Sequence, residues 1–231
     1  MEASVDYPRI HKLEDALGLP GGALSALYGQ ASRVVALDPR ETLYGPDRPS
    51  GSVGVVLSGC FVRQRQLRAG RRHVSGFTVP GDLVGVHAMF GTAPADSLKA
   101  LEPSEVLVVS ATAFKQAMRK RPEGYEPLAR VLHERHKTCE TWCRAYAFGT
   151  SRQRVATFVE MMRAQLGSSG TEDRCTIRSP IRQKDIADAV GLTVVSVCRA
   201  FSRLEEDGAA AYRRDHIVIL SRERLARWLP V

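Results

Sequence analysis

The chain has 231 residues, of which 44% are hydrophobic and 25% charged, the composition of an ordinary globular protein. Its 33 Lys and Arg against 25 Asp and Glu give a net charge of +8, which favours a polyanionic partner such as nucleic acid. No apolar run approaches the roughly 18 residues of a membrane span. Residues 1–10 contain Glu2 and Asp6 and lack the apolar segment of a signal peptide. We therefore expect no membrane partner.

The cysteines are odd in number and include no Cys-x-x-Cys pair, which argues against a disulfide framework or a compact zinc finger. They are Cys60, Cys139, Cys143, Cys175 and Cys198. We expect a reduced, cytoplasmic protein that carries no metal and no other cofactor.

Residues 32–110 read as short strands separated by turn residues, at 32–37, 53–58, 61–67, 73–79 and 105–110. Many short strands at such spacing are typical of a β-sandwich, jelly roll or barrel. Helical segments at 10–17 and 22–30 are expected to cover this β unit.

Residues 112–148 have a helical pattern with a stripe of side chains three and four residues apart, the spacing of a coiled-coil seam. Such a helix packs either on its own β domain or on the same helix of a second subunit, and we favour the homodimer. The predicted dimerisation residues are Leu128, Leu132, Arg135, Cys139, Trp142 and Tyr146.

Histidines and cysteines also gather on this helix. His136, Cys139 and Cys143 share one face, with His133 close by, and a dimer would double the number of ligands. A metal ion or an intersubunit disulfide is one interpretation. The alternative, which we favour, is that Cys139 is a small apolar residue of the seam.

Gly149-Thr150-Ser151 then begins a further amphipathic helix, followed by a polar linker at 167–173 and a short strand at 176–179. Residues 181–220 have the pattern of a winged helix-turn-helix. A helix at 181–189 is followed by Gly191 at the turn, by Thr193 as the cap of a second helix to 207, and by Gly208 as its stop. A hairpin of 209–212 and 216–220 forms the wing. The expected inward residues are Ile186, Ala187 and Val190, then Val197, Phe201 and Leu204.

The outer face of the second helix is predicted to contact DNA. Exposed Val194 and Val195 suit thymine methyl groups, and Arg199 can donate two hydrogen bonds to guanine. Net charge does not locate this site, because residues 1–150 and 151–231 each carry +4. A solvated basic face on a protein-interaction module is the alternative. The predicted DNA-binding residues are Gln183, Thr193, Val194, Val195, Ser196, Cys198, Arg199, Arg203, Arg213 and Arg214.

A β-roll, a long helix and a C-terminal winged helix-turn-helix, in that order, resemble the CRP/FNR superfamily of bacterial transcription regulators over about residues 20–230. The matching stretches are Val-Leu-Ser-Gly at 56–59, Gly-Phe-Thr-Val-Pro-Gly-Asp-Leu-Val-Gly at 76–85, and residues 185–199. The Pro-Gly-Asp-Leu-Val-Gly run is similar to the FNR/FixK branch.

The resemblance implies an α+β fold: an N-terminal double-stranded β-helix (a jelly roll like cyclic-nucleotide-binding domains), a long dimerisation helix and a C-terminal winged helix-turn-helix. It also implies a homodimer on a palindromic operator of double-stranded DNA, with recognition helices about 34 Å apart. The expected domains are residues 1–111, 112–149 and 150–231.

The chain departs from this family at its cofactor sites. Cyclic-nucleotide binders hold the phosphate with an Arg followed by Ser or Thr, where this chain has Ala95-Asp96-Ser97. Because Asp96 would repel a phosphate, we predict no binding of cyclic AMP. The iron–sulfur sensors carry cysteines near the N-terminus, but none precedes Cys60, so no such cluster is expected. Haem stays an open but disfavoured alternative, because a lone histidine is usually structural.

The recognition helix departs as well. Relatives have a Glu-x-x-Ser-Arg pattern, whereas residues 195–199 read Val-Ser-Val-Cys-Arg. Losing the Glu removes an acceptor for cytosine, so Val195 is predicted to favour thymine at that place. Cys198 either fills the Ser position or acts as a redox switch whose oxidation opposes DNA binding.

RNA polymerase is a further candidate partner, although the loop that touches it in relatives is acidic and residues 70–73 here read Gly-Arg-Arg-His. No P-loop, nucleophile elbow or zinc-protease motif is present, so we expect no enzyme. The predicted function is a sequence-specific DNA-binding transcription regulator. The alternative is a small-molecule or redox sensor in which a ligand of the β-roll, or Cys198, gates DNA binding.

Overall fold

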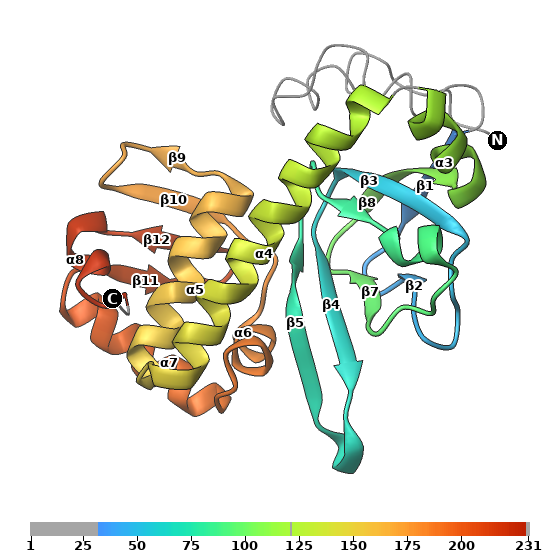
Figure 1. Cartoon of the computed structure of the whole chain (residues 1–231). Coiled ribbons are helices and arrows are strands. Elements are labelled where there is room, and N and C mark those ends of the chain that lie inside the picture. Colours follow the sequence, from blue (N-terminus) through green and yellow to red (C-terminus); the bar gives the residue numbers. More distant parts are fainter. Residues whose placement is uncertain (1–31, 121, 230–231) are drawn as a thin grey trace. The chain divides into compact units, whose positions relative to one another are not determined.

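The computed structural model describes residues 32–120 and 122–229, which form two compact units (Figure 1). The first unit comprises the described residues up to Arg65 together with Ser75–Glu134. The second comprises Gln66–Val74 and the residues from Arg135 onwards. The helical segments predicted at 10–17 and 22–30 lie outside the described residues.

Two four-stranded sheets build the first unit, and the predicted α+β architecture with an N-terminal β-roll is confirmed. One sheet has the order β1 (Ser32–Leu37), β8 (Ser104–Ser110), β3 (Ser52–Ser58) and β6 (Leu83–Val84). The other has the order β2 (Thr42–Tyr44), β7 (Ser97–Ala100), β4 (Phe61–Gln66) and β5 (Arg72–Thr78). Short 3-10 turns lie at η2 (Arg68–Gly70) and η3 (Val86–Phe90).

The five predicted strands of this unit are present, with ends within one residue of the structure. The prediction missed β2, β6 and β7, which have only two to four residues each. Segments this short show no alternation of apolar and polar side chains, and tertiary pairing alone holds them in the sheets.

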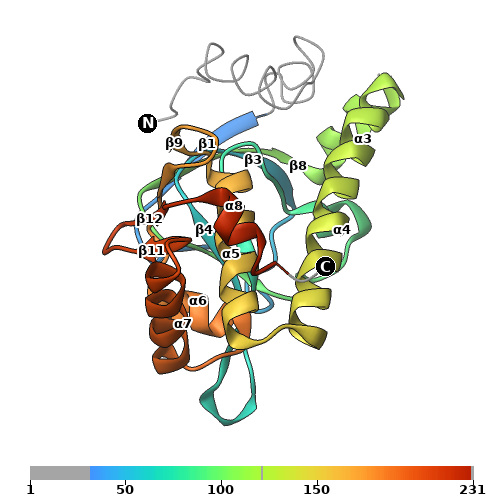
Figure 2. The same ribbon diagram turned by 90° about the vertical axis from the view of Figure 1, so that its left-hand side faces the viewer.

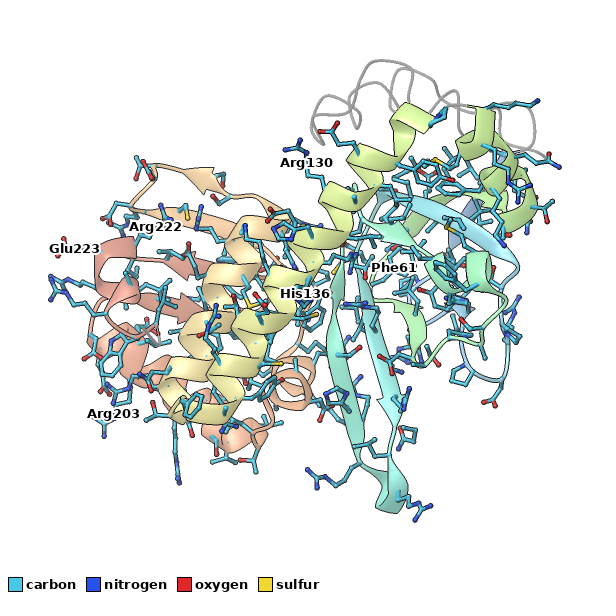
Figure 3. All side chains as sticks on the ribbon, viewed as in Figure 1. Phe61, Arg130, His136, Arg203, Arg222 and Glu223 are labelled. Carbon is cyan, nitrogen blue, oxygen red and sulfur yellow. The ribbon has the colours of Figure 1, made fainter. Side chains whose placement is uncertain are left out.

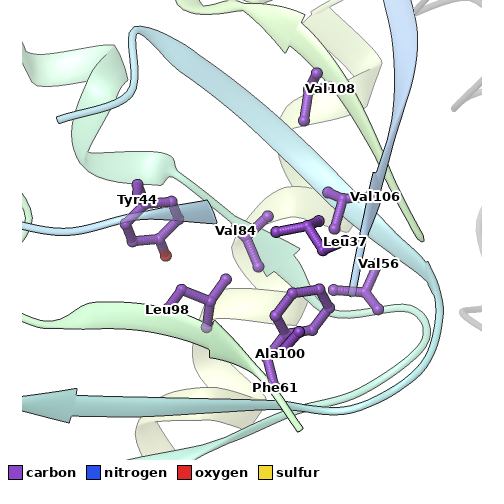
Figure 4. Close-up of a cluster of buried hydrophobic side chains, with 9 residues drawn as sticks. All are labelled: Leu37, Tyr44, Val56, Phe61, Val84, Leu98, Ala100, Val106 and Val108. Atoms are coloured by element: carbon purple, nitrogen blue, oxygen red, sulfur yellow. The ribbon is translucent and has the colours of Figure 1, made fainter. Parts of the chain in front are cut away.

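The core between the two sheets takes apolar side chains from seven of these strands (Figure 4). Phe61 and Leu98 are completely buried there. The cluster consists of Leu37, Tyr44, Val56, Phe61, Val84, Leu98, Ala100, Val106 and Val108.

Strand β8 is apolar on both faces because each face meets a separate core. Val106 and Val108 point into the cluster between the sheets, whereas Leu107 and Val109 belong to a second cluster. Successive side chains of a strand point to opposite faces, so one run of valines and leucine serves both cores. The second cluster includes Phe114 of helix α3 (Ala111–Lys120), which therefore covers the outer face of this sheet.

Helix α4 (Tyr125–Phe148) continues from the first unit into the second. The sequence predicts one helical region over 112–148, but a 3-10 turn, η4 (Pro122–Gly124), separates α3 from α4. Proline removes a backbone donor and glycine weakens a helix, which accounts for the interruption. No helix of the described residues is long and apolar enough to cross a membrane.

The second unit packs three helices with a small antiparallel sheet (Figure 2). Helix α5 (Ser151–Leu166) begins at a capping box, in which Thr150 and Gln153 each accept a hydrogen bond from the other's backbone N–H. It packs against α6 (Gln183–Val190) and α7 (Val194–Glu206). The sheet has the order β11 (Ala210–Tyr212), β12 (His216–Ile219), β10 (Cys175–Arg178) and β9 (Ser169–Gly170), and α8 (Arg222–Ala226) follows it.

Arg154, in the first turn of α5, donates hydrogen bonds to carbonyl groups at the ends of two other helices. It donates to the carbonyl oxygens of Tyr146 at 2.9 Å, Gly149 at 3.1 Å and Val190 at 3.5 Å. The last carbonyls of a helix lack partners within the helix, and a cation there is favourable. One guanidinium therefore joins the C-terminal ends of α4 and α6.

Candidate nucleic-acid interface

The turn between α6 and α7 is set by a single glycine. Gly191 has φ of 66° in the left-handed region, where a side chain is strained, and its N–H donates to the carbonyl of Ala187. The first helix starts at Gln183 rather than at the predicted 181, because Arg182 is extended and its N–H donates to the Asp185 carboxylate at 3.2 Å. Sequence reasoning missed this cap, since it expected the helix to begin two residues earlier.

Thr193 caps α7 as predicted. Its hydroxyl oxygen accepts a hydrogen bond from the Ser196 N–H at 3.1 Å and lies 2.9 Å from the Ser196 hydroxyl. The cap satisfies one of the otherwise unpaired N–H groups of the first turn. The first residues of α7 are thus held in helical conformation at an exposed position.

One side of α7 is buried against the rest of the second unit, as the apolar spacing predicts. The buried residues are Val197, Ala200, Phe201 and Leu204, at most 5% exposed. Ile186, Ala187 and Val190 of α6 are buried as well. Since these positions fix the rotation of both helices about their axes, the remaining side chains of α7 face outward.

The outward residues include two valines that are unusually exposed for their type. Val194 is 41% and Val195 58% exposed, and Arg199 is exposed one turn further along. In the part of the chain that the structure describes, Arg199 forms no ion pair. Its guanidinium can therefore bind a partner without first breaking an internal contact.

Cys198 and Gln183 join the two helices of the motif. The Cys198 thiol donates a hydrogen bond to Gln183 Oε1 at 2.9 Å, and both side chains are half-buried. This contact gives the cysteine a structural use: it orients the Gln183 amide at the start of α6.

The arginines predicted to contact DNA differ in their internal partners. Arg213 donates to Glu205 at 2.6 and 3.2 Å. This hydrogen bonding and the charge of Glu205 raise the pKa of Arg213, and the same hydrogen bonding and the charge of Arg213 lower the pKa of Glu205. Arg203 projects from α7 and pairs with Glu206 at 3.0 Å (Figure 3). Within the described ranges, exposed Arg214 has no ion-pair partner.

The wing is anchored to the helices by an aromatic residue. The Tyr212 hydroxyl donates to the carbonyl of Ile181 at 3.1 Å, and its ring lies 5.4 Å from that of Phe201. The wing loop, residues 213–215, is exposed. Exposed Arg182, next to Gln183, is a further basic residue near the motif, and the prediction missed it because it placed this residue inside the helix.

The six residues predicted for dimerisation do not share one environment. Leu128 packs against the second core cluster, and Trp142 stacks on Tyr146 at 5.6 Å and contacts Phe158. Arg135 and Tyr146 are half-buried, whereas Leu132 and Cys139 are exposed. Burial raises the pKa of Tyr146 to about 12, against the opposing charge of Arg154 and with a contribution from Cys143.

In the first unit, the carboxylate of Asp96 is hydrogen-bonded to side chains of the same unit. Its carboxylate accepts hydrogen bonds from Arg65 Nε at 3.1 Å and from the Ser75 hydroxyl at 2.5 Å. Asp82, in the Pro-Gly-Asp run, accepts from the Val79 N–H at 2.9 Å. The two carboxylates that stand near the family's cyclic-nucleotide motif are thus engaged within the roll.

Comparisons with known proteins agree with this geometry. Residues 34–121 match the cyclic nucleotide-binding domain and residues 153–228 match the Crp-like helix-turn-helix domain. The transcriptional regulatory protein btr of Bordetella pertussis is 27% identical over 83% of this chain and 79% of its own length. The nitrogen fixation regulation protein FixK of Bradyrhizobium diazoefficiens is 27% identical over 86% of this chain and 82% of its own. The solved structure of FixK2 from Bradyrhizobium japonicum superposes with a TM-score of 0.77 at 25% identity, covering 87% of this chain and 98% of FixK2.

A helix-turn-helix with an exposed second helix, joined to a cyclic-nucleotide-binding-like roll, defines a DNA-binding transcription regulator. The chain belongs to the CRP/FNR superfamily, on the side of FixK and the FNR-type regulators. That family is made up of transcription regulators rather than enzymes.

The Arg213–Glu205 pair predicts an effect on DNA binding. Glu205→Gln removes the anionic partner of Arg213 and frees the guanidinium for a phosphate. We expect severalfold tighter DNA binding and a log–log salt dependence steeper by about one unit. Fluorescence anisotropy at several salt concentrations measures both quantities.

Glu223→Gln is the matched control for this prediction. It makes the same charge change and removes a pair of the same length, 2.6 Å to Arg227, on helix α8. Equal gains in the two variants would mean that net charge alone acts, and no gain for Glu205→Gln would mean that Arg213 does not reach DNA.

Proposed function

We propose that the chain acts as a homodimer on a two-fold symmetric operator, reads bases through Val195 and Arg199, and does so without cyclic AMP. The observation that carries the base-reading part is the exposure of both side chains on the outer face of a capped helix whose other face is buried. A recognition helix reaches base edges with the residues of its N-terminal half, which is where these two residues lie.

Each of the two side chains suits a particular contact in the major groove. Arg199 can donate two hydrogen bonds to O6 and N7 of guanine, the commonest specific contact. Val195 offers a branched apolar surface for a thymine methyl group, and it has no acceptor for the amino group of cytosine. The surrounding contacts to the DNA backbone and to neighbouring bases are assigned to Thr193, Val194, Ser196, Arg203, Arg214 and Gln183. Arg213 is assigned to a phosphate once it leaves Glu205.

Selection of bound sequences from random duplex DNA tests this assignment. Arg199→Ala should weaken operator binding by about 1–3 kcal/mol and relax the requirement at one position of each half-site. Val195→Ala should relax a neighbouring position at which the wild type selects thymine. Arg227→Ala, at an exposed arginine that directly follows α8, is the control and should leave the selected sequence unchanged. An unchanged sequence with Arg199→Ala would refute the assignment.

Independence from cyclic AMP is supported by the charge at Asp96. A cyclic phosphate is an anion and needs a cationic partner, but at this place the roll presents a carboxylate. Arg65 already pairs with that carboxylate at 3.1 Å. Binding a phosphate there would break this pair and bring two negative charges together.

Titration calorimetry with cyclic AMP checks this proposal on the full chain. We expect no measurable binding up to millimolar nucleotide, and a change in operator affinity of less than about twofold at that concentration. A dissociation constant in the low micromolar range would overturn it.

The proposed dimer uses the exposed face of α4. Along this helix the residues at alternating steps of three and four, starting from Tyr125, are exposed as far as Cys143, and Leu132 is 42% exposed. This seam is shifted by one residue from the predicted one at three positions, because Leu128, Arg135 and Trp142 turn toward their own chain. The proposed seam consists of Tyr125, Ala129, Leu132, His136, Cys139, Cys143 and Tyr146.

Leu132→Asp tests the seam, because it places a charge where the dimer buries an apolar side chain. We expect the dimer dissociation constant to rise at least about tenfold in sedimentation equilibrium, with operator affinity falling accordingly. Lys137→Glu makes a larger charge change at an exposed position outside the seam and should leave the dimer intact. Equal dissociation of both variants, or none with Leu132→Asp, would contradict this seam.

A further inference from the structure

Two thiols lie one helical turn apart on the exposed face of α4. Cys139 and Cys143 are both exposed, and neither has a hydrogen-bond partner among the described residues. Cys60 and Cys175, by contrast, are buried, and Cys198 donates to Gln183. Among the five cysteines, Cys139 and Cys143 are thus the two that are neither buried nor hydrogen-bonded to another described residue.

Their spacing suits chelation of a metal ion. Side chains four residues apart on a helix are neighbours, with about 5–6 Å between their Cβ atoms. Two histidines at this spacing hold zinc in helical metal sites, and zinc-binding cysteine pairs commonly have two to four intervening residues. Cys139 and Cys143 have three. One helix can therefore supply two thiolate ligands to the same ion.

The described part of a single copy does not complete such a site. Structural zinc is bound by four ligands in a tetrahedron. In the described part of one chain, no group of three or more His, Cys, Asp or Glu side chains is placed to hold a metal. A second copy is the source of further ligands that the α4 face offers.

The proposed dimer, on which this inference rests, supplies them. Cys139 and Cys143 are consecutive residues of the seam, so they fall in adjacent layers that face the same two residues of the second helix. Four sulfur atoms then surround one point on the dimer axis. His136, one layer away, already lies 3.3 Å from the carboxylate of Glu140, so it is the less available ligand.

We propose that Cys139 and Cys143 of two copies bind one Zn²⁺ ion as four thiolates across the α4 seam. Binding replaces the four thiol protons, which leave to solvent, and no electron is transferred. A thiolate site selects a thiophilic ion over Mg²⁺ or Ca²⁺, which prefer oxygen ligands. The ion links the two helices at one register.

The test uses the full-length chain, reduced, stripped of metal with a chelator and then titrated with Zn²⁺. We expect one ion per two chains, measured by elemental analysis after gel filtration, and a lower dimer dissociation constant with zinc than without it. Co²⁺ as a probe should give the visible absorption of a tetrahedral thiolate complex. Cys139→Ser and Cys143→Ser should each abolish these signals.

Cys198→Ser is the matched control, because it removes a thiol outside the seam and should retain one ion per dimer. A dimer that forms without zinc and binds none would overturn the metal site while leaving the proposed dimer intact. So would a dimer that is cross-linked by a Cys139 disulfide on oxidation and stays metal-free when reduced. A chain that stays monomeric at all concentrations, with or without Zn²⁺, would overturn both proposals.

Discussion

The inward packing of α7 is the constraint from which the rest of the interface follows. Val197, Ala200, Phe201 and Leu204 lie at the spacing of one helical face, and their burial leaves the helix a single rotation about its axis. A rotation by one residue would expose Phe201 and bury Arg199, at a cost of several kcal/mol for the lost apolar burial and the desolvated charge. The exposure of Val194, Val195 and Arg199 is thus a consequence of the core beneath them.

The arginines of the second unit differ in the partners that their guanidinium groups have within the folded chain. Arg154 is committed to helix-end carbonyls, and Arg213 is held by Glu205. Arg199 and Arg214 lie on the exposed surface with no ion pair to another described residue. A surface pair costs little to break, so the Arg213 guanidinium can be released from Glu205 at small cost, whereas Arg154 is a fixed part of the structure.

The sequence predicts those features that depend on neighbours along the chain. The turn at Gly191, the cap at Thr193 and the two buried helix faces follow from local propensity and a 3.6-residue period, and the structure confirms them. The Glu205–Arg213 pair joins residues of different elements, and strands β2, β6 and β7 are held only by partners distant in sequence. Neither kind of feature has a local signal.

Helix α4 shows why an apolar stripe alone does not identify an interface. Two stripes at steps of three and four run along it. They share Leu132, Cys139 and Tyr146 and differ by one residue at the positions between these. Leu128 and Trp142 are the more apolar residues, yet they cover their own chain. Burial in the folded chain, which the sequence does not contain, is what separates the two stripes.

The guanidinium of Arg154 has a mechanical consequence for the regulator. Because it holds the carbonyl ends of α4 and α6 from the first turn of α5, a displacement of one of these three helix termini strains its hydrogen bonds to the others. A change in the path of α4 at Tyr146 therefore bears directly on the end of α6, the first helix of the helix-turn-helix. By the same hydrogen bonds, a displacement of the helix-turn-helix acts back on the C-terminal end of α4.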